Sequence, residues 1–247
     1  MSTQRRKALI TGAGRNIGRA IALRLARSGC DVVVHTRANK AQAEDVAQAA
    51  RAFGVEVLVC LGDIASRDDM RHLMERVLEN FGHVDILINV ASIRPDQDFL
   101  EMSFESWQHV MNANLGSVFH LTQACLPGMV ERRWGRIINF VGMNSVRGYA
   151  RRTHIAASKH AIWGLTKALS REFGPHNVTV NAISPGPTET SGHVPAFAER
   201  IQNQVSEIPL GRLGKTEEIA ALAEFLASED GGFVSGQIIG ANGAAET

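Results

Sequence analysis

The feature that most constrains the fold is a regular alternation of short apolar runs with segments of helical period. Seven runs are almost continuously apolar and lack the polar–apolar alternation of a sheet with one solvated face. They lie at residues 8–11, 31–35, 55–60, 85–89, 136–141, 179–184 and 237–240. Strands of this kind are buried on both faces, as in a parallel sheet.

The segments between these runs carry apolar stripes with helical spacing. Ile17, Ile21 and Leu25 recur every four residues, and a similar stripe occupies 162–173. Alternating strands and helices predict one α/β domain over 1–247, a Rossmann-type doubly wound parallel sheet of about seven strands with helices on both faces. The least regular stretch, 185–209, is the predicted substrate lid.

Composition excludes several classes of protein. Lys plus Arg total 26 against 25 for Asp plus Glu, so no bulk charge favours nucleic acid or a membrane surface. No apolar stretch approaches the roughly 18 to 20 residues of a membrane span. The cysteines are few and far apart, which is typical of a reduced, cytoplasmic protein without a disulfide framework or metal site. The expected partner is a small-molecule substrate.

A glycine-rich turn follows the first apolar run. Residues 11–18 read Thr-Gly-Ala-Gly-Arg-Asn-Ile-Gly and lead directly into a helical segment. The glycines permit a tight turn and a close backbone approach to a pyrophosphate, and the helix N-terminus supplies N–H groups and partial positive charge. The turn predicts dinucleotide contacts at Gly12, Arg15, Asn16, Ile17 and Gly18.

Further motifs follow in a fixed order along the chain. They include Asn-Val-Ala-Ser at 89–92, Asn114 in Asn-Leu-Gly, Ser158-Lys159, and Pro-Gly-Pro-Thr-Glu-Thr at 185–190. With the glycine turn, they resemble the short-chain dehydrogenase/reductase family, in particular its 3-oxoacyl-acyl-carrier-protein reductase-like subgroup, over essentially the whole chain. The resemblance implies catalytic roles for Asn114 and Lys159. It also implies nicotinamide-cofactor contacts at Asp63, Ile64, Asn89, Ala91, Lys159, Pro185, Gly186, Thr188 and Thr190.

The end of the second apolar run indicates which dinucleotide is preferred. An acidic residue there would bind a ribose 2′-hydroxyl and repel a 2′-phosphate. Thr36 occupies this position, Arg37 follows it, and Arg15 is a second cation within the glycine turn. Two arginines without a carboxylate predict a preference for NADP(H), with NAD(H) as the alternative.

The chain departs from the family at two catalytic positions. The resemblance places a proton-donating tyrosine four residues before Lys159 and a serine thirteen residues before that tyrosine, but these positions are Ile155 and Gly142. Isoleucine has no proton to donate, and glycine has no side-chain donor. We therefore predict that ordinary ketones and simple secondary alcohols are poor substrates.

Four nearby residues are candidates for the missing donor. Tyr149 is the only tyrosine and would have to fold in from its loop, with pocket lining and a structural role as alternatives. His154 is adjacent to Ile155 and should point away from the nicotinamide, so a surface or interface position is favoured over general acid catalysis. Asn144 and Ser145 are polar, and either a substrate contact or loop capping fits them.

Several arginines cluster in sequence around the same region. They are Arg94, Arg147, Arg151 and Arg152. Their position predicts either recognition of an anionic substrate or a solvated or subunit-facing surface.

Three function classes remain open at this stage. They are an NADP(H)-dependent carbonyl reductase or alcohol dehydrogenase with an altered proton route, a non-redox lyase or isomerase, and a catalytically silent nucleotide-binding protein. The resemblance also implies a homotetramer or homodimer assembled through 106–132, 153–173 and 235–243.

Overall fold

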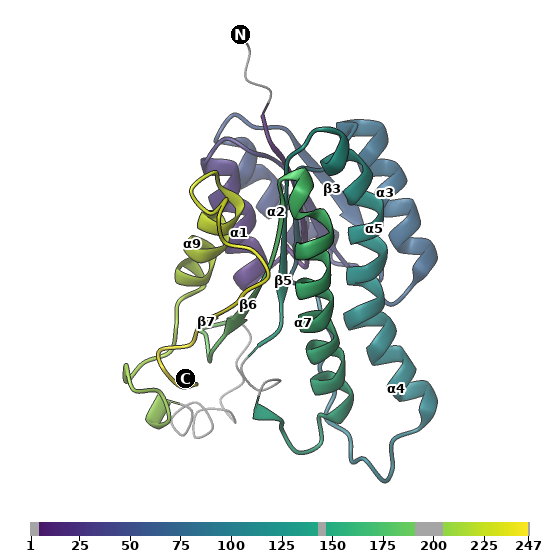
Figure 1. Cartoon of the computed structure of the whole chain (residues 1–247), viewed down its shortest axis with the longest axis vertical. Coiled ribbons are helices and arrows are strands. Elements are labelled where there is room, and N and C mark those ends of the chain that lie inside the picture. Colours follow the sequence, from purple (N-terminus) through teal and green to yellow (C-terminus); the bar gives the residue numbers. More distant parts are fainter. Residues whose placement is uncertain (1–4, 143–146, 191–204, 247) are drawn as a thin grey trace.

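The computed structural model describes residues 5–142, 147–190 and 205–246 and contains a seven-stranded parallel sheet between two layers of helices (Figure 1). The strand order is β3-β2-β1-β4-β5-β6-β7. This arrangement confirms the predicted fold class. The strands are β1 (Lys7–Thr11), β2 (Asp31–Thr36), β3 (Val57–Leu61), β4 (Ile86–Asn89), β5 (Gly135–Phe140), β6 (Val178–Pro185) and β7 (Ile238–Ala241).

Helices cover both faces of the sheet (Figure 1). One apolar layer packs α1 (Asn16–Arg27), α2 (Lys40–Arg51) and α9 (Thr216–Ala227) on one face. The opposite layer packs α3 (Arg67–Phe81), α5 (Ser117–Glu131) and α7 (Thr153–Phe173). A π-helical turn at Asn112–Gly116 joins α4 (Phe104–Met111) to α5, and the sequence pattern did not predict it.

Local sequence explains where these helices begin and end. The stripe of α1 buries Ile21 and Leu25 against the sheet. Helix α3 begins after Ser66, whose hydroxyl accepts a hydrogen bond from the Asp69 amide. It ends at Gly82, where φ is 74° and glycine avoids the penalty of a left-handed conformation.

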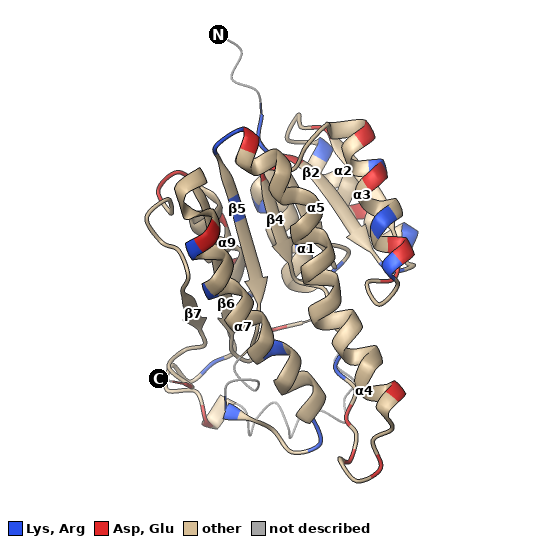
Figure 2. Cartoon of the chain, turned by 45° about the vertical axis from the view of Figure 1, so that its right-hand side comes forward, with Lys and Arg blue, Asp and Glu red and all other residues tan. Residues whose placement is uncertain are grey.

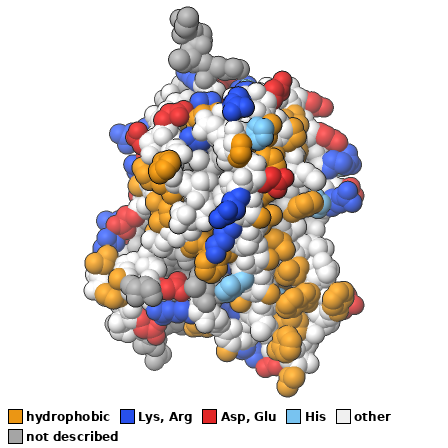
Figure 3. Space-filling model, viewed as in Figure 1, with side chains coloured by type: hydrophobic (Ala, Val, Ile, Leu, Met, Phe, Trp, Pro, Cys, Tyr) orange, Lys and Arg blue, Asp and Glu red, His pale blue; other side chains and the backbone are white. Residues whose placement is uncertain are grey.

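The outer face of α4, α5 and α7 is poor in charged side chains (Figure 2). Apolar side chains gather over this part of the surface (Figure 3). Phe104 is 71% exposed and Phe119 is 46% exposed. In the described part of the chain, no helix is long and apolar enough to cross a membrane.

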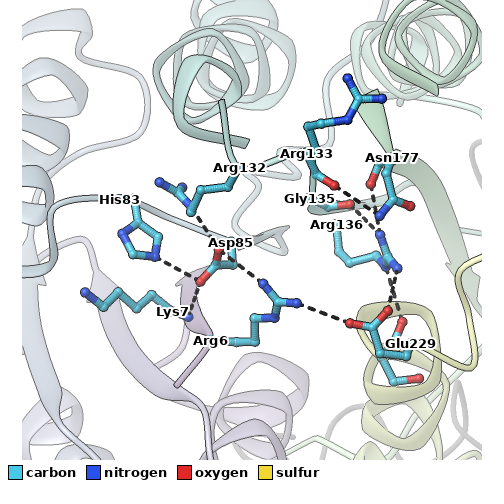
Figure 4. A network of polar contacts seen from close by, with 11 residues as sticks. Arg6, Lys7, His83, Asp85, Arg132, Arg133, Gly135, Arg136, Asn177 and Glu229 are labelled. Atoms are coloured by element: carbon cyan, nitrogen blue, oxygen red, sulfur yellow. Dashed lines mark hydrogen bonds and ion pairs between the residues drawn. The ribbon is translucent and has the colours of Figure 1, made fainter. Parts of the chain in front are cut away.

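Buried charges occupy the amino ends of the strands (Figure 4). The Asp85 side chain is 2% exposed and accepts a hydrogen bond of 2.9 Å from the backbone N–H of Lys7. Its oxygens also lie 3.9 Å from Arg6, 3.2 Å from His83 and 3.4 Å from Arg132. These contacts link the start of β1 to the start of β4.

A second group extends this network to β5 (Figure 4). The Arg136 side chain is 1% exposed, and its guanidinium donates to the carbonyl oxygens of Gly135 and Ser228 at 2.9 and 3.2 Å. It lies 3.8 Å from Glu229 and stacks 4.3 Å from the centre of the Trp134 ring. We call this set around Asp85 and Arg136 the amino-end network.

Candidate functional site

A cavity of about 930 Å³ opens at the carboxyl ends of the strands, opposite the amino-end network. It is lined by the loops that follow β1 to β6 and by the first turns of α1 and α7. Ligands of open α/β sheets bind in this crevice. Residues 12, 14–18, 35–39, 42 and 63–64 line what we call the glycine-loop end, and residues 92–94, 140–142, 152, 155, 156 and 159 line the Lys159 end.

The glycine loop forms a cradle that side chains would fill. Gly12 has φ +67°, and a Cβ there would lie 3.2 Å from the Ala91 Cα. A Cβ on Gly18 would lie 2.2 Å from the Gly12 carbonyl oxygen, so only glycine fits. Helix α1 begins beside this loop with no acidic residue in its first turn. Backbone approach and the partial positive charge of the helix N-terminus therefore fit a dinucleotide pyrophosphate.

Two polar contacts position the loop that follows β4 against the glycine loop. The Thr11 hydroxyl accepts hydrogen bonds of 3.1 Å from the backbone N–H groups of Val90 and Ala91. Beneath them, the Asn89 amide donates to Asn139 at 2.9 Å. Ala91 lines the cavity, whereas Asn89 lies below the lining.

The remaining lining of the glycine-loop end comes from the ends of β2 and β3. Arg15, Thr36 and Arg37 line it, and the two arginines have no ion pair within the described residues. Asp63 and Ile64 also line it. One oxygen of Asp63 accepts a 2.9 Å hydrogen bond from the Ala65 N–H, which fixes the carboxylate beside the cavity.

The segment after β6 closes one side of the cavity. Pro185, Gly186, Thr188 and Thr190 line it. A Cβ on Gly186 would lie 2.7 Å from the Asn242 Cα, so this position also needs glycine. Of the predicted lid at 185–209, residues 191–204 lie outside the described residues.

Lys159 supplies a buried amine to the opposite end. It is 3% exposed, and its Nζ donates a 2.7 Å hydrogen bond to the Phe140 carbonyl oxygen. Burial, with a smaller contribution from the charge of Arg94, lowers the pKa of Lys159 to about 7. Ile155 and Gly142 line the same end. A Cβ on Gly142 would meet nothing within 4 Å, although its φ of +100° disfavours other residues.

Asn114 connects two segments of the site rather than lining the cavity. It is fully buried in the π-helical turn, and its Oδ1 accepts a 2.9 Å hydrogen bond from the Ile93 N–H. Its Nδ2 donates to the Ile93 carbonyl at 3.1 Å and to the Ser158 hydroxyl at 3.2 Å. These bonds join the loop after β4 to the helix that carries Lys159.

Comparison with known proteins identifies the family. A family model described as enoyl-(acyl carrier protein) reductase matches residues 12–244. The chain is 40% identical over 245 residues to a 3-oxoacyl-(acyl-carrier-protein) reductase of Pseudomonas aeruginosa, covering 98% of both chains. The chain belongs to the short-chain dehydrogenase/reductase family. It is also 39% identical over 240 residues to an acetoacetyl-CoA reductase of Allochromatium vinosum, covering 96% of this chain and 97% of the relative.

Solved structures agree with this assignment. YwfH, described as an NADPH-dependent reductase involved in bacilysin biosynthesis, matches with a TM-score of 0.91 and 29% identity over 99% of both chains. An acetoin dehydrogenase from Salmonella typhimurium matches with a TM-score of 0.89 and 28% identity, covering 97% of this chain and 95% of the other. The protein is an oxidoreductase of the short-chain dehydrogenase/reductase type.

In this dehydrogenase/reductase, the candidate donors predicted near Ile155 lie away from the cavity or outside the described residues. Tyr149 is 49% exposed, is absent from the lining, and lies near Arg152. The surface interpretation of His154 is wrong, because the side chain is fully buried and neither ring nitrogen has a hydrogen-bond partner. Burial lowers the pKa of His154. Asn144 and Ser145 lie outside the described residues.

Two of the clustered arginines have partners outside the cavity. Arg147 donates a hydrogen bond to the Ala245 carbonyl oxygen near the C-terminus. Arg151 lies 3.9 Å from Asp98. Neither arginine lines the cavity, so neither contributes to the anion-binding surface that the sequence suggested.

The other two arginines line the Lys159 end. Arg152 forms an ion pair with Asp96, and the closest nitrogen and oxygen are 2.5 Å apart. Arg94 has no carboxylate partner in the described parts of the chain, and its Nε donates to the Ser92 hydroxyl at 3.3 Å. The sequence placed both arginines near the cleft, but it gave no signal that one is paired and the other is not.

Proposed function

We propose that the protein is an NADP(H)-dependent oxidoreductase that interconverts a carbonyl compound and an alcohol with a proton donor other than tyrosine. The observation that carries the proposal is the lining of the Lys159 end. A buried amine faces the cavity there together with Ile155 and Gly142, which stand at the family's tyrosine and serine positions. The cavity therefore combines a dinucleotide cradle with an altered proton route.

The charge of the glycine-loop end supports NADP(H). Arg15 and Arg37 line the cavity without ion-pair partners among the described residues, and Thr36, the last residue of β2, lines it beside them. Guanidinium groups bind phosphate through paired, charge-assisted hydrogen bonds. A ribose 2′-phosphate fits this position, and one structural relative is described as an NADPH-dependent reductase.

We infer that Lys159 carries the proton. A bound nicotinamide dinucleotide would supply the hydride that adds to the carbonyl carbon. The Lys159 ammonium then gives one proton to the carbonyl oxygen, which completes the alcohol and leaves a neutral amine. A pKa of about 7 suits this role, since a general acid works best with a pKa near the working pH. Tyr149 and His154 do not line the cavity and are weaker candidates.

The charge-poor face formed by α4, α5 and α7 supports the expected self-association (Figure 2). A second copy could cover Phe104 and Phe119 by packing the same face against this one. Such a two-fold symmetric contact is common in homodimers. Light scattering at micromolar concentration should give the mass of a dimer or tetramer.

The experiment that tests the proposed function is an assay of purified protein with NADPH and with NADH against a broad panel of carbonyl compounds. Carbonyl-dependent oxidation of NADPH supports the proposal. Product formed without a change in cofactor redox state would point to a lyase or isomerase instead. Tight NADPH binding without turnover of any member of the panel would indicate a silent nucleotide-binding protein.

A further inference from the structure

Arg94 brings a positive charge into the Lys159 end. It follows β4 by five residues, lines the cavity and is exposed to it. Burial by the surrounding protein, with a contribution from Arg152, lowers the pKa of the Arg94 guanidinium. An arginine nevertheless remains charged at neutral pH. The group is therefore a charge that solvent can reach inside a concave, protein-lined space.

The charges around Arg94 do not balance. Arg152 is compensated by Asp96, whereas Arg94 and Lys159 face the cavity without a carboxylate among the described residues. The lining contains one described carboxylate, Asp63, and it follows β3. Two strands separate β3 from β4, which places these loops about 14 Å apart at the ~4.8 Å spacing of neighbouring strands. Uncompensated charge in such a cleft concentrates anions.

We propose that Arg94 binds a carboxylate of the substrate, so that the preferred substrates are small oxo acids and the matching hydroxy acids. This inference rests on the proposed function for its reaction, although the anion subsite itself needs no turnover. Asn114 hydrogen-bonds to both Ile93 and Ser158, the chain neighbours of Arg94 and Lys159, so both groups line the same end of the cavity. A carboxylate held by Arg94 therefore belongs within a few bonds of the carbonyl that receives the proton. Ile155 and Gly142 leave room for the remaining carbon atoms.

Calorimetric titration of acetoacetate and methyl acetoacetate tests the subsite without turnover. Both are added to the protein with saturating NADP⁺, a combination of two oxidised partners that cannot react. The acid should bind at least about 10-fold more tightly than its neutral ester, because charge-assisted hydrogen bonds are the strong ones. Arg94→Gln should weaken acid binding roughly 10- to 100-fold and leave the ester unchanged. Arg94→Lys should fall between these values, since it keeps the charge but loses the planar fork.

Arg151→Gln is the matched control, because Arg151 belongs to the same sequence cluster but pairs with Asp98 outside the cavity. It should bind both compounds as the unmodified protein does. Equal affinity of acid and ester for the unmodified protein overturns the proposal. An equal loss of NADP⁺ affinity in Arg94→Gln also overturns it, because Arg94 would then contact the cofactor.

Acetoacetyl-CoA tests whether Arg94 binds a carboxylate next to the reacting carbonyl or a phosphate farther along the substrate. Its anionic groups lie far from the reacting carbonyl, so Arg94→Gln should leave its binding unchanged, and a loss as large as that of acetoacetate overturns the proposal. Oxidation of NADPH by acetoacetate that is insensitive to Arg94→Gln keeps the proposed function but contradicts the carboxylate subsite. Arg94-dependent acetoacetate binding without NADPH oxidation by any carbonyl compound keeps the subsite but contradicts the proposed function.

Discussion

The two ends of the sheet hold their charged side chains in opposite ways. At the amino ends, Asp85 is surrounded by cationic and N–H partners, and Arg136 donates to carbonyl oxygens (Figure 4). Arg136 also stacks on the Trp134 ring. At the carboxyl ends, Lys159 has one carbonyl partner, and Arg94 has no carboxylate partner among the described residues. Burial alone therefore does not mark a functional charge. A charge that lacks a counter-ion and faces the cavity does.

The largest expected effect lies in the amino-end network. Asp85→Ala leaves Arg6, His83 and Arg132 without their shared carboxylate and should reduce the free energy of unfolding by about 3–5 kcal/mol. NADPH affinity of the folded protein should stay within about 3-fold, because no described residue of this network lines the cavity. Denaturant unfolding and calorimetric titration measure the two quantities.

Glu75→Ala is the matched control for this prediction. Glu75 pairs with Arg71 at 2.7 Å on the exposed face of α3, and such a surface pair is worth about 0–1 kcal/mol. If both variants lose the same stability, the amino-end network has no special structural role and the contrast between the two ends fails.

The next largest effect concerns the proton carrier. Lys159→Met should slow carbonyl reduction by about 10²–10⁴-fold, the usual contribution of a general acid. In the unmodified protein, reduction should slow as the pH rises through about 7, since the amine then loses its proton. Lys167→Met on the same helix is the control, because Lys167 is exposed and lies over the Trp163 ring. A flat pH profile between pH 6 and 9 in the unmodified protein would contradict the role of Lys159.

The same variant has an opposite effect on stability. Burial lowers the pKa of Lys159 from 10.5 to about 7, so the unfolded chain binds more protons between these values. Lys159 therefore destabilises the fold most below pH 7, and this penalty disappears as the pH approaches 10.5. Lys159→Met should raise the Tm at pH 6 and change it much less at pH 10. The same Tm change at both pH values would show that burial does not penalise the charged form of the Lys159 amine.

The sequence predicted the fold because each strand and the glycine loop are specified by residues adjacent in the chain. Continuous apolar runs such as Ile86–Asn89 are typical of strands covered on both faces, and every predicted strand overlaps an observed one within one or two residues. The same locality explains the glycine loop, where Gly12 and Gly18 are required by backbone contacts. The π-helical turn around Asn114 was missed because no local residue pattern specifies it.

The arrangement of the Lys159 end could not be predicted, because it depends on contacts between residues far apart in the sequence. The ion pair between Arg152 and Asp96 joins segments 56 residues apart in sequence, so the sequence could place the arginines near the cleft but could not say which one is compensated. His154 was predicted at the surface or at a subunit interface from its angle to Ile155. Its burial follows from packing around the start of α7, which a helical projection ignores.

A fourth prediction sharpens the contrast by restoring the family donor. Ile155→Tyr places a hydroxyl near Lys159 and should raise the reduction of neutral ketones by about 10- to 100-fold. The gain should persist to higher pH than in the unmodified protein, because a tyrosine holds its proton until a pKa near ~10. The single change is the sharper test, since a serine at Gly142 would be strained by φ +100°. Turnover of neutral ketones across a pH series measures the effect. An unchanged rate would mean that proton supply does not limit reduction.

The smallest effect concerns cofactor choice at the glycine-loop end. Arg37 is exposed, so its interaction with a 2′-phosphate is partly screened by solvent. Arg37→Ala should lower the ratio of NADPH to NADH affinity by about 10-fold, and Arg37→Asp should reverse the preference, because a carboxylate repels the phosphate and accepts from a 2′-hydroxyl. Arg15 remains in both variants, which keeps the loss in Arg37→Ala modest.

Arg19→Ala is the control, since Arg19 lies one turn along α1 and does not line the cavity. Calorimetric titration at low and high salt should show the ratio falling with salt in the unmodified protein and staying nearly constant in Arg37→Asp. Equal affinities for NADPH and NADH in the unmodified protein would mean that neither arginine binds the 2′-phosphate.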